Sequence, residues 1–114
     1  MSAFQEKFDQ AIWKTVSQIK AGRVMGYGEV ARAAGYPRHA RMVSRSMGRS
    51  PVKLPWHRVV RSNRTLAFEA GSDAYKKQAN LLENEGVMFV KGKIIPNQSD
   101  EDISLDELLW GSHE

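Results

Sequence analysis

Four arginines recur at steps of three, four and four residues near the middle of this 114-residue chain. Such spacing places them on one face of a helix that begins at residue 38 and ends near residue 48. A shorter helical segment precedes them and ends at Gly35, which opens a turn. This arrangement is typical of a helix-turn-helix with a basic outer face. We therefore predict that the second helix contacts DNA through Arg38, Arg41, Arg45 and Arg49.

A longer helix is predicted at the amino-terminal end. Apolar residues recur there at helical spacing, and Gly22 follows them as a stop signal. We predict a helix over residues 3–21 that places Phe4 and Phe8 in the core, with Trp13 at the edge of the apolar stripe.

The carboxy-terminal half predicts a smaller amount of β structure. Residues 59–60 are typical of a short strand, and residues 87–95 of a β-hairpin with glycine in its turn. Between them, Ser72 is expected to cap a helix over residues 73–85. The expected fold class is mainly α with a small β component, arranged as a winged helix-turn-helix.

The net charge of +4 is distributed unevenly. All 17 lysines and arginines lie in residues 1–99 with seven acidic residues, a balance of +10, whereas residues 100–114 hold six acidic residues and no basic one. The basic part predicts affinity for nucleic acid, although a solvated basic face gives the same pattern. We expect a winged-helix DNA-binding domain over residues 1–96, followed by an acidic tail over residues 97–114 that is docked or partly disordered.

Composition excludes several classes of function. A chain of this length can bury one modest core, and without cysteine it has no disulfide, thiol nucleophile or cysteine-based zinc site. His39, His57 and His113 lack ligand spacing, so we expect no metal and no cofactor. No signal peptide and no membrane span of ~20 apolar residues is present. We expect a cytoplasmic monomer without a membrane partner, which associates with the nucleoid when it binds DNA.

The segment over residues 54–60, Leu-Pro-Trp-His-Arg-Val-Val, resembles a known signature. It is similar to Pro-Cys-His-Arg-Val-Val, the active-site sequence of O6-alkylguanine-DNA alkyltransferases, with Trp56 in place of the reactive cysteine. Three more segments resemble that family, and the matches follow the family's order along the chain. Residues 26–31 resemble its start of the helix-turn-helix, residues 37–43 its recognition helix, and residues 81–86 its Leu-Leu-x-x-Glu-Gly helix end. The tryptophan identifies the chain as a member of the alkyltransferase-like branch, which binds alkylated guanine without transferring the alkyl group.

The resemblance implies roles in DNA binding for two residues. Arg41 matches an arginine that enters the duplex through the minor groove and takes the place of the flipped nucleotide. Tyr27 matches a tyrosine that helps to rotate the nucleotide out by crowding its phosphate.

The resemblance also implies a lesion pocket. Trp56 would form an apolar wall for the flipped base, and residues 66–72 would form the loop that closes the pocket. His57 and Glu85 match a pair that, in the enzymes, draws a proton from the cysteine, and without a thiol we expect a structural hydrogen bond. Arg58 is expected to fix the loop. The pocket residues implied in this way are Trp56, His57, Arg58, Gly71, Ser72 and Glu85.

The implied function is a non-enzymatic sensor that flips O6-alkylguanine out of duplex DNA and directs the lesion to nucleotide excision repair proteins. Two alternatives stay open. A winged-helix transcription regulator would use the same basic helix, although residues 38–49 contain no Asn or Gln to read base edges. A glycosylase or hydrolase would use Glu85 with His57, or Ser44 or Ser46 with His57, although no nucleophile-elbow sequence is present.

Overall fold

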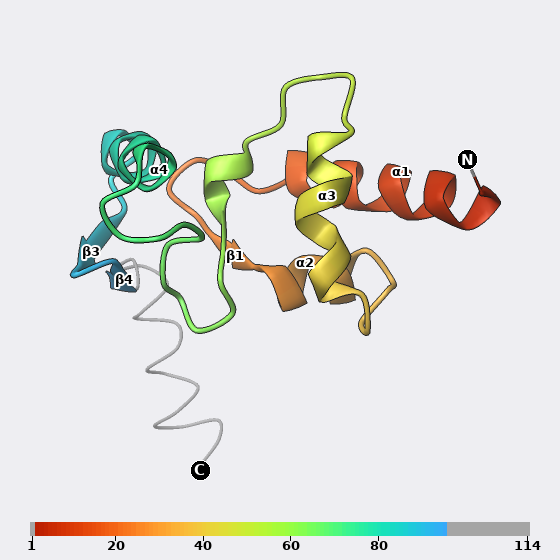
Figure 1. Ribbon diagram of the computed structural model, residues 1–114, viewed down its shortest axis with the longest axis horizontal. Coiled ribbons are helices and arrows are strands. Elements are labelled where there is room, and N and C mark those ends of the chain that lie inside the picture. Colours follow the sequence, from red (N-terminus) through yellow and green to blue (C-terminus); the bar gives the residue numbers. More distant parts are fainter. Residues whose placement is uncertain (1, 96–114) are drawn as a thin grey trace, which may run out of the picture.

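The computed structural model describes residues 2–95. Their helices and strands form two groups (Figure 1). Helices α1, α2 and α3 gather at one end, and α4 lies with the β3–β4 hairpin at the other (Figure 1). The fold is mainly helical with a small β component, as predicted. The helical elements are α1 (Ala3–Ser17), α2 (Tyr27–Ala33), the 3₁₀ turn η1 (Ala40–Met42), α3 (Val43–Gly48), the 3₁₀ turn η2 (Trp56–Arg58) and α4 (Asp73–Asn84). The strands are β1 (Met25–Gly26), β2 (Val59–Val60), β3 (Met88–Val90) and β4 (Lys93–Ile95).

Helix α1 is shorter than predicted, and one of the two phenylalanines expected in the core is exposed. It ends at Ser17 rather than at residue 21, because the chain turns after Gln18 and Gly22 adopts a φ of +85°. The expectation that Phe4 lies in the core is wrong: its side chain is 42% exposed, since the first turn of α1 extends past the edge of the core. Phe4 instead stacks on Phe8, with 5.7 Å between ring centroids.

The helix-turn-helix is present, but its second helix begins later than predicted. Tyr36 N–H donates to the carbonyl of Ala31 (2.8 Å), and Gly35 adopts a φ of +92°, so α2 ends in a glycine turn. The turn continues through Arg38 and His39, and helical structure starts only at η1. Arg38 therefore lies in the turn, whereas Val43 on α3 is fully buried, as predicted.

Two parallel strands join distant parts of the chain. The short strand β2 was predicted, but its partner β1 was not, because two residues carry no detectable alternation. Met25 pairs with Val59 and Gly26 with Val60. This pairing places the start of α2 next to the segment that follows η2. Only glycine fits at position 26, because a Cβ there would lie 2.9 Å from the Cα of Ser62.

The second group of elements closely follows the sequence prediction. Ser72 caps α4 by accepting a hydrogen bond from Tyr75 N–H (3.1 Å), and β3 pairs with β4 in an antiparallel hairpin. These elements enclose a hydrophobic cluster of their own, formed by Val60, Leu66, Leu82, Val87 and Ile94. The larger cluster, which includes Phe8, Ile12, Val16, Val30, Val43 and Val59, lies among α1, α2 and α3.

Two expectations concern membranes and the tail. Over residues 2–95, every helix is too short or too polar to cross a membrane. The prediction of an acidic tail over residues 97–114 lies outside the described residues.

Candidate nucleic-acid interface

An open cavity of about 250 Å³ lies between α2, α3, η2 and the loop after β2. It is slightly smaller than typical ligand pockets, which span roughly 300–1,000 Å³. Its lining carries no charged side chain, and its polar side chains are the hydroxyls of Tyr27 and Ser44. The lining residues are Tyr27, Ser44, Met47, Gly48, Trp56, Val59, Ala67 and Phe68.

Trp56 and Phe68 form the aromatic part of this cavity. Their rings meet edge to face, with centroids 5.9 Å apart, and Phe68 is 36% exposed. Ala67 and Phe68 belong to the segment over residues 66–72 that was expected to close the pocket. Gly71 and Ser72 belong to the same segment but are not among the lining residues, because they form the turn and cap that begin α4.

Tyr27, the first residue of α2, also lines the cavity. Burial raises the pKa of its hydroxyl, while hydrogen bonding from Ser44 and the charge of Arg61 act in the opposite direction. The hydroxyl is therefore protonated near neutral pH and available as a hydrogen-bond donor.

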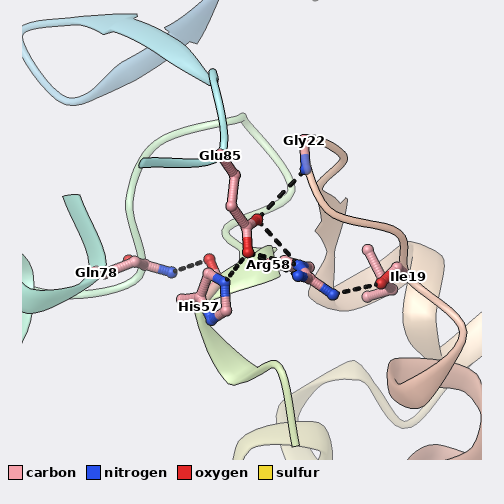
Figure 2. A network of polar contacts seen from close by, with 6 residues as sticks. All are labelled: Ile19, Gly22, His57, Arg58, Gln78 and Glu85. Carbon is pink, nitrogen blue, oxygen red and sulfur yellow. Dashed lines mark hydrogen bonds and ion pairs between the residues drawn. The ribbon is translucent and has the colours of Figure 1, made fainter. Parts of the chain in front are cut away.

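His57, Arg58 and Glu85 form a polar network (Figure 2), and none of the three lines the cavity. The Glu85 carboxylate lies 2.8 Å from Nε2 of His57 and accepts a 2.6 Å hydrogen bond from Nη2 of Arg58. It also accepts one from the backbone N–H of Gly22 (3.3 Å), and Arg58 Nη1 donates to the carbonyl of Ile19 (2.8 Å). The network ties η2 to the end of α4 and to the segment after α1, so the expected His57–Glu85 contact is present as part of a structural clamp.

The network gives the protein a predictable response to acid. Hydrogen bonds from Arg58, and secondarily from His57, lower the pKa of Glu85 from 4.5 to about 2. Because the folded-state pKa is the lower one, the stability contributed by the Glu85 carboxylate is fully present above about pH 4.5 and is lost as the pH falls towards 2. Urea unfolding of Glu85→Gln should therefore show a deficit against wild type at pH 6 that shrinks at pH 3. Glu83→Gln, an exposed position on the same helix, is the control, and a deficit that stays constant with pH would contradict this role.

Gln78 is a site residue that the sequence analysis missed. Its side chain is fully buried on α4, where Nε2 donates to the carbonyls of His57 (3.1 Å) and Val59 (3.0 Å). Its Oε1 accepts from the backbone N–H of Ala67 (2.9 Å). One amide thus holds both the Trp56 segment and the Phe68 segment. The sequence offered one signal for this role: Gln78 precedes the buried Leu82 by four residues, so the two lie on the same face of α4.

The four arginines of the predicted basic face separate into two kinds. The side chains of Arg38, Arg41 and Arg45 are exposed and make no hydrogen bond or ion pair to any residue in the range 2–95. Arg49 instead turns towards α1, where it forms two hydrogen bonds with the buried Asp9 (2.7 and 2.8 Å). These bonds lower the pKa of Asp9. Arg49 therefore packs against α1, and its contact with DNA stays a prediction.

Arg41 lies close to the cavity along the chain. It precedes Ser44 by three residues and Gly48 by seven, and both of these residues line the cavity. Arg41 lies in the 3₁₀ turn that leads directly into α3, the helix that contributes Ser44, Met47 and Gly48 to the cavity. The exposed guanidinium is thus carried by the segment that also forms one wall of the cavity.

A helix-turn-helix with exposed arginines beside a largely apolar cavity defines a DNA-binding domain. The family model described as "6-O-methylguanine DNA methyltransferase, DNA binding domain" matches residues 7–87. The chain belongs to this family.

Relatives and solved structures agree with the family assignment. Over 86 residues the chain is 42% identical to the DNA base-flipping protein of Escherichia coli strain K12. The aligned residues make up 74% of this chain and 65% of that protein. The chain is 31% identical over 107 residues to alkyltransferase-like protein 1 of Schizosaccharomyces pombe, covering 92% and 95% of the two chains. The S. pombe protein in complex with damaged DNA containing O6-carboxymethylguanine is similar with a TM-score of 0.69 at 32% identity, over 83% and 93% of the chains. Mycobacterium tuberculosis OGT in complex with DNA has a TM-score of 0.60 at 32% identity, over 75% of this chain and 50% of that one.

Proposed function

We propose that this protein is a non-enzymatic sensor of O6-alkylguanine in double-stranded DNA. It flips the alkylated base into the cavity that Tyr27, Trp56 and Phe68 line, and Arg41 fills the gap left in the duplex. The observation that carries the proposal is the largely apolar cavity beside an exposed, unpaired arginine. Its relatives include a base-flipping protein and a protein solved with alkylated DNA, which supports the same reading.

Binding without chemistry follows from the residues at the site. The chain has no cysteine, and Trp56 occupies the position of the nucleophile in the resembling signature. His57 lies outside the cavity lining, and its contact Glu85 is shared with Arg58. This argues against a hydrolase that pairs Ser44 with His57, because only Ser44 lines the cavity.

A protein that holds a lesion without altering it requires other proteins to remove that lesion. We therefore propose that the monomeric complex on chromosomal DNA directs the damage to nucleotide excision repair.

The test is a set of dissociation constants at fixed salt for duplexes that contain guanine, O6-methylguanine or a bulkier O6-alkylguanine. We expect the alkylated duplexes to bind more tightly than the undamaged one and to differ little from each other, because a methylene in an apolar pocket is worth only about 1–3 kcal/mol. Mass spectrometry of the recovered DNA should find every base unaltered. Equal binding of all duplexes would support a transcription regulator or a general DNA-binding protein, and altered bases would support an enzyme.

Trp56→Ala should reduce the preference for alkylated DNA by roughly 10-fold, because the adduct loses an aromatic wall. The affinity for undamaged DNA should change little, since it depends on contacts between basic side chains and the DNA phosphates. Val52→Ala, at a 64% exposed position in the preceding loop, is the control. If Trp56→Ala keeps the full preference, the indole only packs the loop.

A further inference from the structure

We propose that Arg32 and Arg61 form a second phosphate-binding face, which holds the DNA backbone beside Tyr27 while the recognition segment holds it through Arg38 and Arg45. This inference rests on the proposed function and extends it to the backbone contacts that accompany base flipping.

The loop that carries Arg61 is packed directly onto the start of α2. The backbone N–H of Gly28 donates to Oγ of Ser62 (3.3 Å), and the Cα of Ser62 leaves no room for a side chain at Gly26. Arg64, three residues after Arg61, pairs with Glu29 on α2 and fixes the other end of the loop. Arg61 is therefore held next to Tyr27 by a rigid turn.

Arg32 reaches the same place from the other end of α2. Its position four residues after Gly28 puts both on one helix face, and its Nη1 lies 3.5 Å from the point where a Cβ of Gly28 would be. The missing side chain at position 28 allows the guanidinium to extend along α2 towards Ser62. Two cations thus approach the turn that positions Tyr27 at the cavity.

The carboxylates in this region are already engaged by other arginines. Glu29 is bound by Arg64 and by the backbone N–H of Gly26, and Glu85 is bound by Arg58. The side chains of Arg32 and Arg61 are exposed, and neither guanidinium makes a hydrogen bond or ion pair to any of the residues 2–95, although the charge of Arg32 acts on Glu29 from beyond ion-pair distance. Exposed guanidiniums without a carboxylate partner suit phosphate, which they can bind in a bidentate manner.

Tyr27 separates the two basic faces. It lines the cavity from the α2 side, while Ser44 and Gly48 line it from α3, the helix that carries Arg45 and follows Arg38 and Arg41. A nucleotide whose base enters the cavity between them therefore has cations on both sides of its sugar. The charge of Arg61 acts on the Tyr27 hydroxyl, so we assign Arg61 to the phosphate of the flipped nucleotide.

The experiment measures the salt dependence of binding for the double variant Arg32→Gln/Arg61→Gln. Each lost phosphate contact lowers the slope of log K against log salt by about 0.9, so we expect a loss of roughly two units on both undamaged and O6-methylguanine duplexes. The ratio of the two affinities should stay close to that of wild type. The control Lys76→Gln/Lys77→Gln removes the same charge from exposed positions on α4 and should keep the wild-type slope.

Each outcome separates this inference from the proposed function. A double variant with the slope of its lysine control overturns the second face, whatever the lesion preference. A loss of lesion preference together with an unchanged slope also overturns it, because the arginines would then act on the base. A wild-type protein that binds all duplexes equally, with the slope still reduced in the variant, refutes the lesion sensor and leaves the phosphate face standing.

Discussion

Arg41→Ala is expected to weaken binding to an O6-methylguanine duplex by about 100-fold, because a flipped base costs a few kcal/mol of stacking and pairing that this side chain offsets. The substitution should not disturb the fold, since Arg41 is exposed and unpaired within residues 2–95. Fluorescence anisotropy with a labelled duplex measures the loss, and an unchanged melting temperature confirms that the variant is folded.

Arg45→Ala is the matched control for this prediction. Arg45 lies one turn further along, is equally exposed and has no partner in the described part of the chain. It should lose only about one phosphate contact and about one unit of salt slope. If the two variants bind the lesion duplex equally well, Arg41 is a phosphate contact and does not enter the duplex.

Arg49→Ala should have the opposite profile, a large loss of stability with little direct effect on DNA. Asp9 is only 2% exposed, and removing its partner leaves a buried carboxylate without its cation. We expect the melting temperature to fall by roughly 10 °C. Salt dependence measured below the unfolding transition should keep the wild-type slope.

A second substitution tests the origin of that loss. Asp9→Asn in the Arg49→Ala background removes the buried charge and should recover part of the stability, whereas Asp9→Asn alone should destabilise. A stable Arg49→Ala protein with a lower salt slope would return Arg49 to the DNA-binding row that its spacing indicates.

Local signals explain what could be predicted from the sequence. Ser72 as a helix cap, the hairpin turn at Gly92 and the glycine that ends α2 each depend on a few neighbouring residues. Trp56 was assigned to the cavity because a signature of adjacent residues carried it.

Contacts between distant segments could not be predicted in this way. Spacing placed Arg49 on a helix face, but it could not show that α1 packs there and offers Asp9, 40 residues earlier. Gln78 binds segments 11 to 21 residues away, so only the fold reveals why a buried amide is needed. His57 and Glu85 were expected in the pocket from the family signature, whereas the fold joins them to Arg58 in a network whose residues do not line the cavity.

The cavity lies where the two hydrophobic clusters meet. Tyr27, Met47 and Val59 pack with the cluster around α1, whereas Ala67 and Phe68 directly follow Leu66 of the other cluster. A base held in the cavity therefore contacts residues that belong to both clusters. Because the site exists only while the two clusters are joined, binding adds its own free energy to the cost of separating them. Lesion DNA is thus expected to stabilise the junction between the two halves of the protein as well as the residues that line the cavity.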